Sequence, residues 1–193
     1  MSKRIALFSA AAFAALALTA AVVAPVSAQD KMKSEMSGEK TVMVGGAAMF
    51  PSKNIIQNAV NSKDHTTLVA AVKAAGLVDT LEGKGPFTVF APTNAAFGKL
   101  PAGTVDSLVK PENKPTLTKI LTYHVVPGKL EASSLTDGKK LKTVEGEELT
   151  VKKSGDKVMI VDAKGGSSTV TIANVNQSNG VIHVVDTVLM PAS

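Results

Sequence analysis

The segment from Pro86 to Phe97 constrains the fold of this chain more than any other. Its first half alternates like a strand, and its β-branched and aromatic residues suit a surface that is buried on both faces. Pro92 has no N–H to donate, so we expect the strand to end there. Thr93 or Asn94 can then cap a helical turn, and Phe97 returns to the apolar layer. The segment therefore predicts a buried strand, a sharp corner and a capped helix in direct succession.

Helical patterns come first along the rest of the chain, and strand patterns follow. Apolar residues recur at helical spacing in 53–60, 66–75 and 116–123; Ser52 is placed to cap the first helix, and Gly76 to end the second. After residue 123, short alternating runs are separated by turns that contain glycine, as in antiparallel strands. The order of helices and strands predicts an α+β domain. The expected strands are 141–144, 149–153, 158–162, 168–173 and 181–188.

The run 181–188 is apolar on both faces, so we expect it to be the central strand of a sandwich. His183 lies inside this run and is expected to be a neutral, hydrogen-bonded structural imidazole. Asp186 should find backbone N–H donors or a hydroxyl, because an unpaired carboxylate there would be costly. Asn179 and Gly180 precede the run, where glycine would supply the positive φ of a tight hairpin.

Three segments together resemble the fasciclin domain family: 86–97, 123–128 and 179–191. They occur in family order within a region from about Ser52 to Pro191. The resemblance implies one compact α+β domain, a β-sandwich wedge with a layer of helices, which is extracellular, adhesive or matrix-associated, and not an enzyme. The residues that we interpret as its structural signature are Thr88, Phe90, Pro92, Thr93, Asn94, Phe97, Asn179, Gly180, His183 and Asp186.

Tyr123 and His124 occupy the junction between the last expected helix and the strand region. The family resemblance implies that this tyrosine–histidine pair is linked to cell adhesion and receptor contact. The aliphatic neighbours favour a different role, in which the ring of Tyr123 packs in the core and His124 stabilises a chain reversal. Both interpretations stay open from sequence alone.

The first residues have the order of a secretory signal peptide. Basic residues precede an apolar run, and small residues at 26–28 predict cleavage after Ala28; a retained membrane anchor is the alternative. We expect residues 29–50 to be a flexible linker, residues 51–193 to be the domain, and the mature chain to be periplasmic or secreted without membrane insertion. Met32, Met36, Met43 and Met49 allow a weaker hypothesis of copper binding, with Met32 and Met36 at helical spacing.

The composition and motifs argue against several function classes. The chain has no cysteine, and its formal charge of +5 includes a single arginine, Arg4, within the expected signal peptide. Without arginine or tryptophan in the mature chain, nucleic-acid binding is not expected. His65, His124 and His183 show no metal-ligand spacing, and no catalytic or nucleotide-binding motif is present, so we expect no cofactor and no enzymatic activity.

The sequence therefore predicts an exported, monomeric module that contacts cell-surface or matrix proteins or glycans. A carrier for a small hydrophobic ligand is the alternative, with the ligand in a groove between the helical layer and the sandwich. A lytic or modifying enzyme is a third and weaker alternative.

Overall fold

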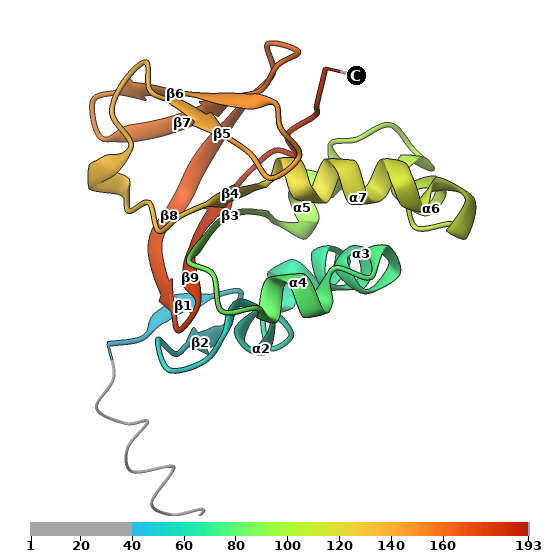
Figure 1. The fold of residues 1–193 in the computed structure, drawn as a ribbon, viewed down its shortest axis with the longest axis horizontal. Coiled ribbons are helices and arrows are strands. Elements are labelled where there is room, and N and C mark those ends of the chain that lie inside the picture. The colour runs from blue at the N-terminus through green and yellow to red at the C-terminus, as the bar shows by residue number, and fades with distance from the viewer. Residues whose placement is uncertain (1–39, 193) are drawn as a thin grey trace, which may run out of the picture.

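The computed structural model describes residues 40–192 (Figure 1). No helix within this range is long and apolar enough to span a bilayer. The predicted signal peptide and the predicted copper ligands Met32 and Met36 lie outside the described residues.

A seven-stranded sheet with the order β4-β3-β9-β8-β7-β6-β5 forms the centre of the domain. Strands β3 and β9 are parallel, and every other neighbouring pair is antiparallel. All residues of β9 are buried, which confirms its expected central position, although the strand ends at Val185 rather than at residue 188. The strands are β3 (Phe87–Pro92), β4 (Val125–Pro127), β5 (Lys140–Lys142), β6 (Glu148–Ser154), β7 (Lys157–Val161), β8 (Ser167–Gln177) and β9 (Gly180–Val185).

The sheet curls until its two end strands approach one another. Strand β8 is long and bent, with register irregularities between Val170 and Val175 and a positive φ of 58° at Asn174 (Figure 1). Bulges of this kind bend a strand and increase its twist. Just beyond β5, the N–H of Val144 donates a 2.8 Å hydrogen bond to Val125 O in β4. The sheet is therefore nearly closed, with a core between its two halves.

A layer of helices covers one side of strands β3, β9 and β8 (Figure 1). The α-helices are α2 (Ile55–Ala59), α3 (Thr66–Ala75), α4 (Val78–Glu82), α5 (Asn94–Gly98), α6 (Thr104–Leu108) and α7 (Lys114–Tyr123). The 3₁₀ turns are η1 (Lys63–His65), η2 (Pro111–Asn113) and η3 (Ala132–Ser134). Helices together with this sheet confirm the predicted α+β class.

The ends of the helices follow local sequence signals, with one correction. Gly76 ends α3 in the left-handed conformation, as expected. Helix α2, however, begins at Ile55, because Asn54 rather than Ser52 is its cap. The Asn54 side chain accepts from Gln57 N at 2.8 Å, and the Gln57 side chain accepts from Asn54 N at 3.1 Å, which is a complete capping box.

The end of the predicted flexible linker is ordered instead. Strands β1 (Val42–Val44) and β2 (Ala47–Met49) form an antiparallel hairpin. Val44 and Met49 are each only 2% exposed and belong to the core under the helices. The domain therefore includes this hairpin, and the linker assignment of residues 29–50 extends too far.

Two buried clusters divide the interior. The first fills the space between the helices and the sheet, and the second lies between the two halves of the curled sheet. Val89 belongs to the first and Phe90 to the second, so the opposite faces of β3 line both clusters.

Candidate functional site

His124 is a buried bridge between α7 and the C-terminal segment. Its side chain is almost fully enclosed, with the residue 2% exposed. Nδ1 lies 2.8 Å from Ile120 O, and Nε2 lies 3.0 Å from Leu189 N. A carbonyl can only accept and an amide N–H can only donate, so this network assigns a neutral ring protonated at Nδ1. Both ring nitrogens are therefore used within the domain.

Tyr123 is fully buried in the cluster between the sheet halves. Its hydroxyl accepts from Ala163 N at 2.9 Å and donates a longer bond, 3.4 Å, to Glu148 O. Burial raises the pKa of Tyr123 to about 12, with a smaller opposing effect from the Ala163 N–H. The structure thus places the tyrosine–histidine pair in the core, the arrangement that the aliphatic neighbours favoured. Direct contact of these side chains with a partner would require the core to open.

The bridge at His124 predicts a loss of stability in mild acid. Burial lowers the pKa of His124 to about 4, against 6.5 for an ordinary histidine, and the Ile120 carbonyl only partly opposes the shift. The unfolded chain therefore binds a proton that the folded chain excludes between these values. The stability contributed by the neutral ring is complete above pH 6.5 and is lost as the pH falls toward 4, by on the order of 3 kcal/mol.

Urea unfolding at several pH values between 7 and 4.5 measures this loss, and NMR titration of the His124 ring reports its pKa directly. A folded protein whose His124 signals titrate near pH 6.5 would contradict the assignment.

His183 has the structural role that its position in β9 predicted. It is fully buried, and its Nε2 lies 2.7 Å from Leu130 O, while its Nδ1 accepts a longer bond, 3.4 Å, from Asn174 N. Its ring stacks on Phe90 with centroids 5.7 Å apart. Burial lowers the pKa of His183, with the Leu130 carbonyl in partial opposition. The ring therefore ties the loop after β4 to the central strands.

Asp186 finds both kinds of donor that were expected for it. Its Oδ1 accepts from Thr169 N at 2.8 Å and from Thr187 Oγ1 at 3.1 Å, and Lys99 Nζ lies 3.7 Å from Oδ2. Partial burial alone would raise the pKa of Asp186, but these hydrogen bonds and the lysine charge together lower it. Asp186 thus bonds to Thr169, near the start of β8, through its side chain, and its backbone N–H also donates to Thr169 O at 3.1 Å.

Asn179 and Gly180 correct the hairpin interpretation. Gly180 does not have a positive φ. It is required by space instead, because a Cβ there would lie against Phe87 O and within 2.9 Å of Phe87 N and C. Asn179 is more than a turn residue: its side chain accepts from Ile55 N at 3.1 Å and donates to Leu81 O at 2.6 Å, so it fastens α2 and α4 to the sheet.

The remaining polar signature residues also form hydrogen bonds within the domain. Thr93 is the cap of α5 and accepts from Ala96 N at 3.2 Å, at the corner predicted after Pro92. Asn94 binds the start of α3, accepting from Thr67 N at 3.0 Å. Thr88 Oγ1 donates to Gly128 O at 2.6 Å, which holds the loop after β4 against β3.

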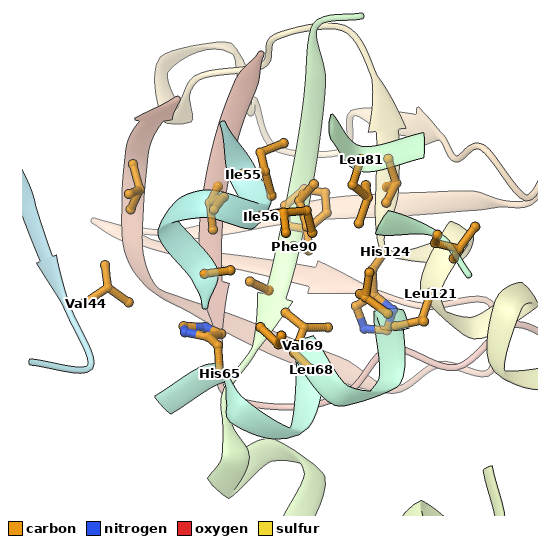
Figure 2. Close-up of a pocket in the computed structure, with 18 of the residues that line it drawn as sticks. Val44, Ile55, Ile56, His65, Leu68, Val69, Leu81, Phe90, Leu121 and His124 are labelled. Carbon is orange, nitrogen blue, oxygen red and sulfur yellow. The ribbon is translucent and has the colours of Figure 1, made fainter. Parts of the chain in front are cut away.

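A small apolar cavity of about 40 Å³ lies between the helices and the sheet (Figure 2). His65 and His124 line it from opposite sides of the view, and the other lining residues are apolar. Sequence spacing alone could not indicate that these two histidines share a cavity, because His65 ends η1 and His124 follows α7, far along the chain. Within residues 40–192, no group of three or more His, Asp or Glu side chains is arranged to hold a metal ion.

The outer face of β5–β7 is open to solvent. Leu149 and Val151 point inward from β6, so the alternate residues Thr150 and Lys152 point outward. The register places Lys140 and Lys142 of β5 opposite Thr150 and Glu148, on the same outward face. Met159 of β7 is paired with Lys152 and is half-buried. We name this surface the lysine face: Lys140, Lys142, Glu148, Thr150, Lys152 and Met159. Within it, Lys140 Nζ lies 3.3 Å from Glu148 Oε2.

The fold and these contacts define a structural module, an α+β wedge in which the polar signature side chains bond within the domain. Comparison with known proteins agrees. A family model described as the fasciclin domain matches residues 63–191. The chain therefore belongs to the fasciclin domain family, as its three segments predicted.

Several relatives support this membership. The chain is 51% identical to Protein sll1483 of Synechocystis sp. over 153 residues, which cover 79% of this chain and 82% of that protein. It is 36% identical to Immunogenic protein MPB70 of Mycobacterium bovis over 192 residues, covering 95% and 93% of the two chains. Cell surface glycolipoprotein MPB83 of the same species is 40% identical over 153 residues, 77% of this chain and 64% of that protein.

A solved structure shows the same fold. The FAS1 domain pair of the insect cell adhesion molecule fasciclin I superposes with a TM-score of 0.65 and 18% sequence identity. The match covers 73% of this chain and 52% of that one.

Proposed function

We propose that this chain is an exported fasciclin domain that acts as a non-catalytic adhesion or surface-interaction module. The observation that carries the proposal is the use of Tyr123, His124 and His183 inside the core. Their polar atoms are bonded to backbone groups, which leaves no activated base or nucleophile among them. The identity of relatives such as the cell surface glycolipoprotein MPB83 supports the same function class.

The lysine face is the surface that we assign to partner contact. It combines exposed ammonium groups with the half-buried thioether of Met159 on a rigid sheet. Such a mixture of charge and apolar area suits the proteins or glycans of a cell surface or matrix, because charges orient a partner and apolar atoms lose water on contact. The module functions as a monomer in this proposal and does not bind nucleic acid.

A charge reversal of Lys142 and Lys152 to glutamate tests this assignment. Both side chains are exposed, so we expect the melting temperature to stay within a few degrees. Adhesion of the purified full chain to envelope or host-surface preparations should fall by about tenfold or more, as two contacts change from attraction to repulsion. Lys73→Glu with Lys110→Glu, at exposed positions on and beside the helices, is the matched control. Equal adhesion by both double variants would exclude the lysine face as the surface that contacts the partner.

The apolar cavity supports a second candidate function, carriage of a small hydrophobic ligand. It lies between the helices and the sheet, where a ligand groove is expected from the sequence. Its volume of about 40 Å³ is far below the roughly 150 Å³ of a cavity that binds benzene, so a lipid would need the helices to move apart. Mass spectrometry of organic extracts from the purified full chain tests this function; a carrier should release a small apolar compound in stoichiometric amount.

A further inference from the structure

Four lysines form a diagonal line across the outer face of β5, β6 and β7. The register places Lys140 of β5 opposite Thr150 and Lys157 of β7 opposite Ser154. Along β6, Lys152 lies midway between Thr150 and Ser154, so from β5 to β7 each lysine is displaced by two residues along the strand direction. We name this line the lysine diagonal: Lys142, Lys140, Lys152 and Lys157.

The charge along the lysine diagonal is regularly spaced and mostly unpaired. Two residues of a strand span roughly 6.7 Å and neighbouring strands lie about 4.8 Å apart, so successive Cα atoms are roughly 7 to 8 Å apart. All four side chains are exposed. Lys140 Nζ lies 3.3 Å from Glu148 Oε2, and the other three lysines form no ion pair within residues 40–192. Asp156, next to Lys157 in the turn after β6, is an exposed carboxylate at the other end.

The rest of this surface restricts the kind of partner. Strands β5, β6 and β7 contain no aromatic residue, so they offer no ring on which a neutral sugar or a nucleobase can stack. Their largest outward apolar side chain, Met159, is half-buried, whereas the core of a protein interface and a membrane-inserting surface are both richer in apolar side chains. The hydroxyls of Thr150 and Ser154 lie beside the lysines and both donate and accept hydrogen bonds.

We propose that the lysine diagonal binds extended polyanionic polysaccharides, which carry a carboxylate or sulfate group at regular intervals. Repeated anions match cations that are spread along a line, whereas one compact anion would require the lysines to converge against their mutual repulsion. Thr150 and Ser154 bond sugar hydroxyls between the charged contacts. The proposal rests on the surface-interaction function above and adds to it the chemical class of the partner.

Fluorescence anisotropy of labelled oligogalacturonate, which carries a carboxylate on every sugar, measures this binding when the purified full chain is titrated into it. Dextran sulfate as a competitor compares sulfate with carboxylate, and neutral dextran is the uncharged control. We expect saturable binding that dextran sulfate displaces and neutral dextran does not. Because the contacts are exposed charges, the affinity should fall about tenfold or more between about 50 and 300 mM salt. The ratio of the two polyanion affinities identifies the preferred anionic group.

Three variants test the position of the site. Lys142→Glu with Lys152→Glu should weaken oligogalacturonate binding about tenfold or more. Lys73→Glu with Lys110→Glu changes the net charge equally, away from the line, and should leave the affinity within about twofold. Glu148→Gln removes a carboxylate beside the line, so the affinity should rise about two- to threefold. Partial unfolding would not produce this gain.

Equal binding by the two double variants would overturn the proposal, and so would displacement by neutral dextran. Equal affinity for phosphatidylglycerol vesicles or for single-stranded DNA would also overturn it, because the surface would then bind any polyanion. Failure of the surface-interaction function is distinguishable. If Lys142→Glu with Lys152→Glu abolishes adhesion but neither polyanionic glycan binds the original chain, the partner is of another class and that function stands. If neither adhesion nor glycan binding changes in this variant, the lysine face fails in both roles.

Discussion

Gly180→Ala is expected to be the most destabilising single substitution considered for this domain, with a loss of more than about 4 kcal/mol. Gly180 pairs with Phe87 where β9 and β3 run parallel, and the added methyl would overlap the Phe87 carbonyl. Neither strand can retreat, because β9 is held by β8 on its other side and β3 by β4. A change this small can therefore separate the two central strands.

Urea unfolding monitored by circular dichroism measures this effect, and Gly98→Ala is the matched control. Gly98 is the last residue of α5, and a Cβ there would meet nothing within 4 Å. Alanine is the better helix former, so we expect the control to be neutral or slightly stabilising. Near-native stability of Gly180→Ala would contradict the close approach of β9 to Phe87 of β3.

His124→Ala should have the second largest effect, about 3 to 4 kcal/mol. It leaves Ile120 O and Leu189 N without their partner in the core, and it enlarges a cavity that already exists.

Tyr123→Phe keeps the ring and loses only the hydroxyl that accepts from Ala163 N, so we expect the free energy of unfolding to fall by about 1 to 2 kcal/mol.

Adhesion measured on the same variants separates the two interpretations of this pair. If His124 acts through structure, adhesion should follow the folded fraction of each variant. A His124→Ala protein with native melting behaviour and lost adhesion would instead establish direct contact with the partner.

The sequence predicted those features that depend on neighbouring residues. Residues only a few positions apart determine the strand at 87–92 and the corner after Pro92. The same holds for the Thr93 cap of α5 and for the end of α3 at Gly76. The cap of α2 was missed although its signal is local, since Asn54 and Gln57 have capping-box spacing. The β1–β2 hairpin was missed because its strands are short and its Gly- and Ala-containing sequence is typical of a linker.

Features that depend on distant residues could not be predicted in this way. Gly180 was recognised as important for the wrong reason, because the need for space arises only when β3 packs against β9. The shared environment of His65 and His124 depends on a cavity that several elements form together. The spacing of the histidines in the sequence shows only that they are far apart along the chain. It cannot reveal that two of them, His65 and His124, line the same cavity.

The hydrogen bond from Val144 to Val125 has a consequence for how molecules of this protein behave when crowded. Open sheet edges allow neighbouring copies to join strand to strand and grow into fibrils. Here Val125 O on the β4 edge already accepts a hydrogen bond from Val144 N of the same chain, and the β5 edge carries Lys140 and Lys142. Neighbouring copies would then meet through side chains rather than through backbone groups, so crowding should favour strand-to-strand association less than an open sheet edge would.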